Sequence, residues 1–283
     1  MLYICGTPIG NLEDITLRQL RILQEVDLIA AEDTRHTKKL LNHYNINTPL
    51  ISFYEHNQHE KSKVILQKLQ DNKNIALVTD AGMPCISDPG FLLVTLCYNN
   101  NIKVTTVPGP TAVISGLVLS GLPTDRYVFE GFLPKNKKEK QQVLTNIANE
   151  KRTIVLYEAP HRLIKTLTSL SQIIDHNRKI SIVREITKIY EEVKTFDVHS
   201  AIKYYSDNLP LGEIVIVIEG APKEDLQLEI KIKDLIDNVT LLVEDGFSKN
   251  EAIKQTAKNL ALAKKIVYNA VKDIKFNNYE HTD

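Results

Sequence analysis

The sequence predicts an α/β protein built from two αβα domains and a small C-terminal helical module. Short β-branched runs alternate with helical patterns in the first part of the chain, and a second alternating set follows. Residues 227–276 have a helical pattern throughout. We therefore expect an N-terminal domain with a mostly parallel sheet (1–115), a second domain with a mixed sheet (116–222) and a helical extension (223–283).

Five short runs in the N-terminal domain have the composition of buried strands. They span residues 2–5, 28–31, 50–53, 75–79 and 103–107. The helical patterns between them span residues 16–26, 35–44, 58–71 and 90–98. In the first helix Leu17, Leu20, Leu23 and Val26 recur every three residues, which predicts that they share one face. Strands that alternate with helices indicate a doubly wound parallel sheet.

The second domain repeats this alternation with one difference. Its predicted strands span residues 127–132, 153–158, 179–184, 189–198 and 213–218, and its predicted helices span 137–149, 160–174 and 198–206. The fourth of these strands follows the third closely, which predicts an antiparallel pair within a mixed sheet. Residues 222–225 have the composition of a linker, and three helices are expected after them.

The composition bounds the functional classes. The chain has 283 residues, 43% hydrophobic and 25% charged, as in ordinary globular proteins. Basic and acidic residues balance at 35 each, so nucleic-acid binding would need a local basic patch. No apolar run reaches the roughly 18 residues of a membrane span, and the first residues lack a signal-peptide pattern, so we expect a cytoplasmic protein without membrane association.

Cysteine and histidine usage gives no sign of a metal centre. Cys5, Cys85 and Cys97 form no CxxC pair, which is typical of a reducing compartment, and we expect Cys5 and Cys97 in the core. His56 and His59 stand three residues apart in a polar segment and are expected to face solvent. We predict no metal ligands.

Two loops at the ends of the first strands have alternative interpretations. The segment after the first strand, GTPIGNLEDIT, lacks the Walker A and GxGxxG patterns and fits a tight turn whose helix is capped by Asp14 or Thr16. The segment after the second strand contains Asp33, Thr34 and Arg35. Asp33 or Thr34 could cap the next helix, and Arg35 could instead bind a phosphate.

The loops after the fourth and fifth strands indicate a binding cleft. The first of them, TDAGMPCISDPG, contains two glycines and two prolines, and the second, PGPTA, leads directly into a helix. Such loops are stiff, and glycine allows close approach of the backbone to a ligand. Ligands of open α/β sheets bind beyond the carboxyl ends of the strands.

Taken together, the strings GTPIGNLEDIT, AEDTRHT, TDAGMPCISDPG, PGPTA and YEAPHR resemble the tetrapyrrole methylase superfamily of non-Rossmann methyltransferases. Within it they are most similar to the branch that methylates a cytidine ribose in the decoding region of 16S ribosomal RNA. The resemblance covers residues 1–221 in order, and Met83 stands where the branch typically has Thr.

The resemblance implies S-adenosylmethionine as cofactor, 16S ribosomal RNA in the small ribosomal subunit as partner, and a homodimer. The cofactor contacts that it implies are Pro8, Ile9, Asp80, Gly82, Pro84, Ile86, Gly109, Thr111, Ala112, Tyr157 and Ile214. A ribose hydroxyl is a poor nucleophile, so a nearby base would help. The candidates for proton transfer and phosphate steering are Asp33, Arg35, Asp88, Glu158 and Arg162.

RNA binding is expected from two groups of lysines. Lys135, Lys137 and Lys138 precede or begin a predicted helix, and Lys264 and Lys265 lie in the last helices, where lysines outnumber acids. The C-terminal helices could form a helix-turn-helix-like element or a dimerisation module. Two alternatives remain: a methyltransferase of this fold acting on a small tetrapyrrole, and a nucleic-acid-binding protein without enzymatic activity.

Overall fold

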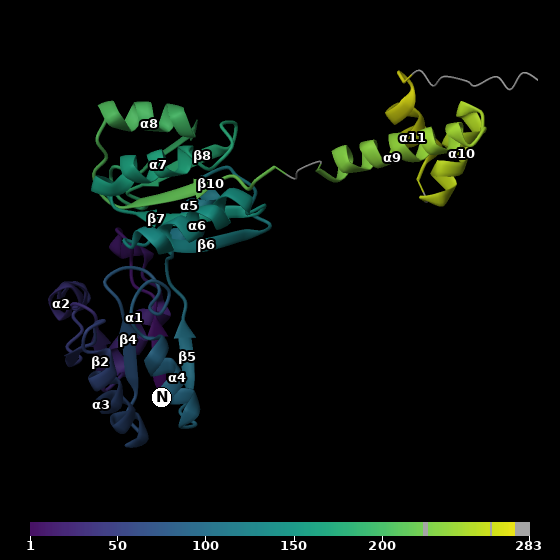
Figure 1. The fold of residues 1–283 in the computed structure, drawn as a ribbon. Helices are drawn as coiled ribbons and strands as arrows, with labels where there is room; N and C mark the ends of the chain where they lie inside the picture. Colours follow the sequence, from purple (N-terminus) through teal and green to yellow (C-terminus); the bar gives the residue numbers. More distant parts are fainter. Residues whose placement is uncertain (223–225, 261, 275–283) are drawn as a thin grey trace, which may run out of the picture. The chain divides into compact units, whose positions relative to one another are not determined.

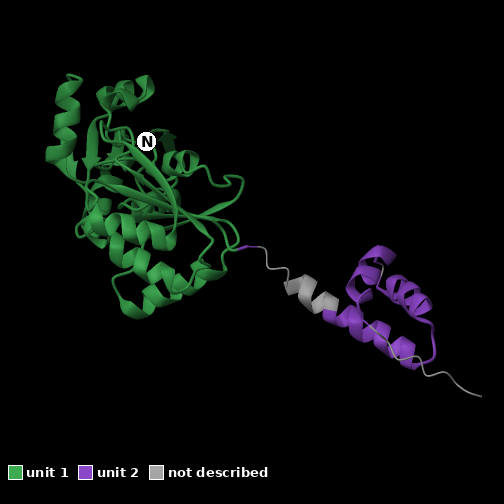
Figure 2. Ribbon diagram, turned by 90° about the horizontal axis from the view of Figure 1, so that it is seen from above, with its two compact units in different colours: residues 1–221 green, residues 222–283 purple. Residues whose placement is uncertain are grey.

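The computed structural model describes residues 1–222, 226–260 and 262–274, without the side chains of residues 226–232. The chain forms two compact units, Met1–Ala221 and Pro222–Asp283 (Figure 2). Unit 1 contains both predicted sheets, and unit 2 contains the predicted helices of the C-terminal extension. Among the described residues, no helix is long and apolar enough to cross a membrane.

The first sheet of unit 1 is parallel throughout (Figure 1). Its strands are β1 (Leu2–Cys5), β2 (Leu28–Ala31), β3 (Leu50–Ser52), β4 (Ile75–Val78) and β5 (Val104–Val107). They lie in the order β3-β2-β4-β1-β5, as a doubly wound sheet requires. Because β4, β1 and β5 are neighbours and parallel, the loops that follow them meet at one edge of the sheet.

Helices and two separate hydrophobic clusters cover the two faces of this sheet. The helices are α1 (Leu17–Glu25), α2 (Thr34–His43), α3 (Gln58–Gln70) and α4 (Phe91–Asn99), and a 3-10 turn, η1 (Leu12–Asp14), precedes α1. One cluster joins Cys5 to residues of α1 and α2, and the other joins Cys97 to residues of α3. Both cysteines are fully buried, which confirms their prediction as core residues.

The three-residue spacing predicts most of the buried face of α1: Leu23 and Val26 are buried and Leu20 packs against the same cluster, and Leu17 is the exception. Leu17 is 85% exposed, whereas Gln19, Ile22 and Leu23 are buried. An α-helix turns once in about 3.6 residues, so a strict three-residue repeat drifts around the helix and leaves its first member outside. The prediction that Leu17 shares the buried face is wrong.

The second sheet is mixed, as predicted. It contains β6 (Tyr127–Phe132), β7 (Thr153–Glu158), β8 (Lys179–Arg184), β9 (Glu192–Asp197) and β10 (Ile214–Ile218), in the order β6-β7-β10-β8-β9. Only β6 and β7 run parallel. The pairing of β8 with β9 is antiparallel, which confirms the prediction from their close succession. Strand β9 begins at Glu192, three residues later than predicted, because Glu185–Glu191 form a loop.

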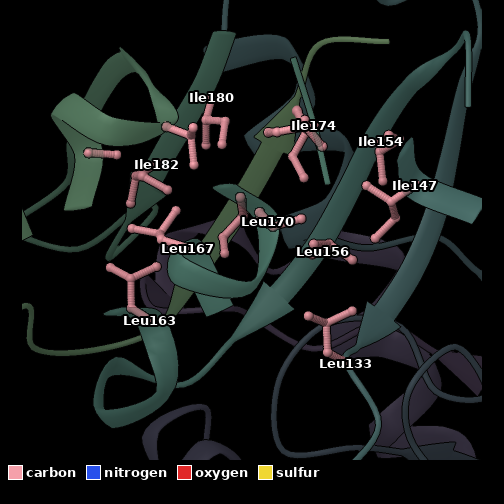
Figure 3. Packing of buried hydrophobic residues seen from close by; sticks show 14 of the residues in the cluster. Leu133, Ile147, Ile154, Leu156, Leu163, Leu167, Leu170, Ile174, Ile180 and Ile182 are labelled. Carbon is pink, nitrogen blue, oxygen red and sulfur yellow. The ribbon is translucent and has the colours of Figure 1, made fainter. Parts of the chain in front are cut away.

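Three helices cover the outer face of this sheet: α6 (Lys137–Asn149), α7 (Leu163–Ser171) and α8 (Val198–Asp207). Residues 160–162 form a separate 3-10 turn, η2 (Pro160–Arg162), before α7 begins. Figure 3 shows aliphatic side chains from α7, such as Leu163 and Leu167, packed near those of the strands, such as Ile182. Burial of these aliphatic chains stabilises the outer layer through removal of apolar area from water.

Helix α5 (Ala112–Leu119) packs against the inner face of the second sheet, although it follows β5 of the first sheet directly. A Cβ atom on Gly116 would lie 2.8 Å from Val215 Cγ1, so the helix and β10 are in close contact. Ile9, Val113 and Val215 belong to one buried cluster at this place. The boundary predicted after residue 115 therefore falls within a helix that contacts the second sheet.

Unit 2 is a bundle of α9 (Leu226–Glu244), α10 (Lys249–Asn259) and α11 (Lys264–Val271). Its own core contains Leu235, Val239, Ile253 and Val267, among others. Helix α10 begins with a capping box, in which the Ser248 hydroxyl and the Glu251 carboxylate satisfy each other's backbone amides. The three helices predicted between residues 227 and 276 are confirmed within the described residues.

Candidate active-site cleft

A cavity of about 420 Å³ lies between the two sheets of unit 1. Its walls come from the loops after β1, β2, β4 and β5, from the ends of β6 and β7, from the loop after β8 and from the start of β10. Cavities of about 300–1,000 Å³ accommodate cofactors and other small ligands. The cavity lies at the carboxyl edge of the parallel sheet, where such ligands bind in open α/β folds.

Two of its loops are joined by backbone hydrogen bonds. The Thr7 amide donates to the Gly82 carbonyl over 2.9 Å, and the Gly82 amide donates to the Thr7 carbonyl over 3.0 Å. The Thr7 hydroxyl also donates to the Thr79 carbonyl over 3.0 Å. Gly82 lines the cavity with φ +82°, a backbone conformation that side chains with a Cβ rarely adopt. The loops after β1 and β4 therefore form one rigid wall.

Gly109 supports this wall from behind. A Cβ atom on Gly109 would lie 2.4 Å from the Gly6 carbonyl oxygen, so the loop after β5 touches the loop after β1 through glycine backbone. Gly109 does not line the cavity, and neither do Pro8 and Pro84. The structure thus places these three predicted cofactor contacts in the packing around the cleft.

Three carboxylates line one side of the cavity: Glu32, Asp80 and Asp88. The Thr79 hydroxyl donates to Glu32 over 2.6 Å, and the Asp33 amide donates to Asp80 over 3.1 Å. Burial, followed by repulsion from Glu32, raises the pKa of Asp88 to about 6. Burial also raises the pKa of Asp80. This concentration of negative charge favours a cationic ligand.

The opposite side of the cavity is apolar and aromatic. Tyr157 packs against Phe132 with ring centroids 5.5 Å apart, and burial raises the pKa of Tyr157 to about 12. Ile186, Ile214 and Val215 complete this side. The cavity therefore suits a ligand that has an aromatic or apolar part together with a positive charge.

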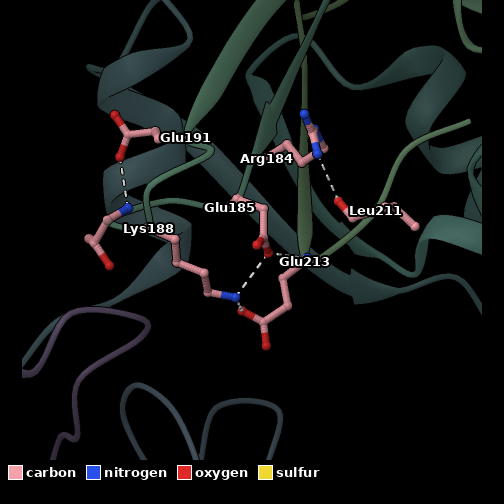
Figure 4. Close-up of polar contacts among 7 residues, drawn as sticks. Arg184, Glu185, Lys188, Glu191, Leu211 and Glu213 are labelled. Atoms are coloured by element: carbon pink, nitrogen blue, oxygen red, sulfur yellow. Dashed lines mark hydrogen bonds and ion pairs between the residues drawn. The ribbon is translucent and has the colours of Figure 1, made fainter. Parts of the chain in front are cut away.

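An ion-pair network holds the loop that carries Ile186 (Figure 4). The Lys188 ammonium binds Glu185 over 2.9 Å and Glu213 over 3.1 Å, and the Thr187 amide donates to Glu191 over 2.7 Å. Glu185 and Thr187 both have positive φ, at 54° and 68°, which costs about 1–3 kcal/mol at each position. The network offsets part of this cost and fixes the loop at the cavity wall.

Asp33 and Arg35 lie at the start of α2 and do not line the cavity. Asp33 caps the helix, since its Oδ1 accepts from the Arg35 amide over 2.8 Å, and its Oδ2 pairs with the Arg35 guanidinium over 2.7 Å. The Arg35 hydrogen bonds hold the pKa of Asp33 far below its usual range. The helix-capping interpretation of Asp33 is confirmed, and likewise Thr16 caps α1.

Glu158 lines the cavity, but its carboxylate is enclosed by donors. It accepts from the Thr166 hydroxyl over 2.5 Å and from the Ala159 amide over 2.8 Å, and it pairs with Arg162 Nε over 3.3 Å. Its side chain is fully buried. Arg162 also donates to the Leu133 carbonyl over 2.7 Å, so this pair stabilises the junction of β7, η2 and the end of β6.

The structure brings together most of the predicted site. The predicted residues that line the cavity are Ile9, Asp80, Gly82, Ile86, Asp88, Thr111, Ala112, Tyr157, Glu158 and Ile214. Sequence reasoning missed Glu32, Ser87, Val113, Phe132 and Ile186, which also line it. Glu32 directly follows β2 and precedes the predicted Asp33. Its place at the end of a strand could have identified it as a cavity residue. Ile186 lies in no motif, and only the fold places it here.

The predicted RNA-binding lysines are exposed. Lys135, Lys137 and Lys138 lie at the start of α6 in unit 1, and Lys264 and Lys265 begin α11 in unit 2. Lys140, one turn further along α6, donates to Ser169 over 2.9 Å, and burial lowers its pKa. Within the ranges that the structure describes, no three His, Cys, Asp or Glu side chains gather as a metal site.

Comparisons with known proteins agree with this architecture. Residues 1–201 match the family described as Tetrapyrrole (Corrin/Porphyrin) Methylases. The "Ribosomal RNA small subunit methyltransferase I" of Synechocystis sp. is 47% identical over 95% of this chain and 96% of its own length. The protein of that name from Thermotoga maritima is 48% identical over 77% of this chain and 98% of its own length.

Solved structures share the fold at low sequence identity. A uroporphyrin-III C-methyl transferase from Thermus thermophilus complexed with S-adenyl homocysteine is 18% identical, with a TM-score of 0.54 over 76% of this chain and 96% of its own. A diphthine synthase is 13% identical, with a TM-score of 0.59 over 77% and 89%. The fold is thus common to proteins of divergent sequence.

Proposed function

Because the chain belongs to the tetrapyrrole methylase family, we propose that it is an enzyme that methylates ribosomal RNA of the small ribosomal subunit with S-adenosylmethionine as methyl donor. The observation that carries the proposal is the cavity between the two sheets, with carboxylates on one side and an apolar, aromatic wall on the other. Relatives named for this activity match nearly the whole chain, across 95% of its length.

The residues present fit the cofactor. S-adenosylmethionine would supply an electrophilic methyl group on a positively charged sulfonium. Asp80 offers acceptors for its ammonium and hydroxyl groups, and Ile9, Tyr157 and Ile214 offer apolar surface for its adenine. We assign the remaining contacts to Gly82, Ile86, Thr111 and Ala112. Pro8, Pro84 and Gly109 would act indirectly, since they support the loops that touch the ligand.

Asp88 is our candidate for the proton acceptor. With a pKa of about 6, its carboxylate is mostly ionised at neutral pH and is still a stronger base than an ordinary aspartate. Its place on the cavity wall lets it meet a hydroxyl group beside the methyl donor. The main contribution of the protein would be alignment of the two reactants in a site from which water is excluded.

The other candidate residues are suited to holding the site or the RNA in place and not to proton transfer. Asp33 is paired with Arg35, and Glu158 accepts from Thr166, Ala159 and Arg162, so neither carboxylate has free capacity to take a proton. We propose that Arg35, whose guanidinium side chain is 88% exposed, contacts RNA phosphates. Arg162 would stabilise the wall that carries Glu158 and Tyr157.

The proposed acceptor is the 2′-hydroxyl of a cytidine in the decoding region of 16S ribosomal RNA, cytidine 1402. The exposed lysines at positions 135, 137 and 138 of unit 1, and at positions 264 and 265 of unit 2, would neutralise RNA phosphates. We further propose a cytoplasmic homodimer that acts on assembled or late-assembling small subunits.

A methyl-transfer assay tests this function. Purified small ribosomal subunits from cells that lack the activity, naked ribosomal RNA and a porphyrin precursor are each offered with labelled S-adenosylmethionine, and the modified nucleotide is mapped. We expect label on one cytidine of the subunit. Label on the porphyrin precursor alone would favour the tetrapyrrole alternative. Absence of calorimetric binding of S-adenosylhomocysteine would favour a nucleic-acid-binding protein without enzymatic activity.

A further inference from the structure

A second cavity, of about 380 Å³, adjoins the cleft and shares two residues with it. Ser87 and Asp88 line both cavities. The second cavity is otherwise formed by residues at or just before the start of α3 and α4, two consecutive helices that cover the same face of the parallel sheet. Asp88 is thus accessible from both the cleft and the second cavity.

The lining of this second cavity combines one aromatic ring with polar side chains. Phe91, the first residue of α4, lines the cavity and is 76% exposed, so its ring is accessible to a ligand. Around it lie Glu55, Gln58 and His59, which together offer hydrogen-bond acceptors and donors. A flat ring face beside hydrogen-bonding groups is the arrangement by which proteins hold an unstacked nucleobase.

We propose that this second cavity, defined by Glu55, Gln58, His59, Ser87, Asp88 and Phe91, receives the target nucleoside of the RNA, with its base stacked on Phe91 and its ribose at Asp88. The inference rests on the proposed RNA-methylating function and specifies where its substrate enters. It places the ribose hydroxyl within reach of the carboxylate shared with the cleft, so that Asp88 can take the hydroxyl proton from the side while the oxygen faces the methyl donor directly.

The polar residues also favour cytosine over uracil. A glutamate accepts hydrogen bonds only, and cytosine presents an amino group at the position where uracil presents a carbonyl oxygen. Glu55 would therefore accept from the cytosine amino group and repel the uracil oxygen. Gln58, which can both donate and accept, tolerates either base. Glu55 is thus our candidate for the residue that determines base specificity.

The test uses the full chain and purified small subunits, with two substituted positions and a matched control for each. Phe91→Leu removes the flat ring, and Tyr98→Leu removes an exposed ring at the other end of α4, outside both cavities. Glu55→Gln gives position 55 a donor, and Glu60→Gln makes the same change one turn into α3, away from the cavity.

For Phe91→Leu we expect methyl transfer, measured as kcat/KM, to fall about tenfold or more through loss of base stacking. Phe91→Tyr should restore it, and Tyr98→Leu should match the unchanged protein. The affinity for S-adenosylhomocysteine, measured by calorimetry, should stay within twofold in every variant. With subunits that carry uridine at the target position, Glu55→Gln should raise the uridine-to-cytidine ratio of methylation, and Glu60→Gln should not.

The outcomes distinguish failure of the proposed nucleoside site from failure of the proposed RNA-methylating function. If Phe91→Leu and Glu55→Gln methylate like their controls, the second cavity does not hold the nucleoside, although the proposed function stands. If Phe91→Leu loses cofactor affinity to the same extent as activity, the cavity belongs to the cofactor site, and the inference is again overturned. If the unchanged protein methylates no small subunits, the proposed function and the inference fail together.

Discussion

Thr7 and Gly82, which are 75 residues apart in the sequence, exchange two backbone hydrogen bonds of 2.9 Å and 3.0 Å. These bonds join the loop after β1 to the loop after β4. The pair is an isolated antiparallel bridge that lies beyond the ends of the parallel strands β1 and β4. Ile9 and Asp80, each two residues from a member of the pair, are thereby held at fixed positions on the cavity wall.

Gly82→Val should weaken cofactor binding without unfolding the protein. A valine at φ +82° is strained by about 1–3 kcal/mol, and relief of that strain would displace the loop that lines the cavity. We expect the dissociation constant for S-adenosylhomocysteine to rise at least tenfold in calorimetry. Gly121→Val is the matched control, since Gly121 also has positive φ (69°) but lies away from the cavity. Equal affinities in the two variants would contradict the assignment.

Gly109→Ala should act on stability as well as on binding. Its Cβ would lie 2.4 Å from the Gly6 carbonyl oxygen, and both partners are backbone, so the loops must separate. Overpacking of this kind typically costs about 1–3 kcal/mol, which thermal unfolding would register as a lower Tm. Gly131→Ala separates the two possible costs, because nothing lies within 4 Å of its Cβ position and any fall in its Tm reports only the strain of alanine at φ +63°. A Gly109→Ala protein with unchanged Tm would show that the loops are not in firm contact.

Asp88→Asn should reduce the turnover number by about a hundredfold or more and remove the acid limb of the pH–rate profile. In the unchanged protein that limb should have a midpoint near the pKa of about 6, since the ionised carboxylate is the active form. Asp80→Asn should weaken cofactor binding but leave the limb in place. A limb that persists in Asp88→Asn would assign the proton acceptor to another group.

The same pKa predicts the effect of Asp88 on stability. The pKa of about 6 in the folded state lies above the ordinary aspartate pKa of 3.8, so the folded state binds the proton more tightly than the unfolded state does. The stabilisation is fully present below about pH 4 and is lost as the pH rises through 6. Asp88→Asn, which cannot ionise, should therefore have a higher Tm than the unchanged protein at pH 7, with the difference shrinking toward pH 4. A lower Tm at pH 7 would contradict this sign.

Removal of unit 2, by truncation after residue 222, should leave cofactor affinity nearly unchanged, because every residue that lines the cavity belongs to unit 1. RNA affinity should fall and depend less steeply on salt, since fewer phosphates are neutralised. Lys264→Glu with Lys265→Glu should reproduce part of this loss, whereas Lys103→Glu, at the start of β5, should not. Light scattering would reveal the competing case, in which truncation yields monomers and the salt slope stays the same.

The alternation of strands and helices was readable from the sequence because buried strands and amphipathic helices impose different spacings on apolar residues. Both sheets and the antiparallel pairing of β8 with β9 follow from that pattern. The buried face of α1 follows from it only in part: Leu23 is buried as predicted, but Leu17 is exposed, and Gln19 is buried although a glutamine carries no apolar signal. Periodicity identifies an element more reliably than it identifies which side packs inward.

The candidate site was predictable where its residues fall in stiff loops at strand ends, as with Asp80, Gly82 and Thr111. Ile186 and Phe132 reach the cavity only because the second sheet faces the first, which no local pattern encodes. The role of Gly109 was also hidden, since a glycine that touches a ligand and one that touches another loop look alike in sequence. His59 is exposed, as expected, and only the fold places it beside Phe91.

Helix α5 has a consequence for how ligands enter. Its first residues, Thr111 to Val113, line the cavity, and Gly116 lies against Val215 of the second sheet. The connection between the sheets is therefore a packed helix instead of a pliable hinge, and wide opening would require a buried contact to break. We expect association to be limited by small movements of the loops at the mouth, and the entropy lost on binding to be modest because the two walls are preorganised.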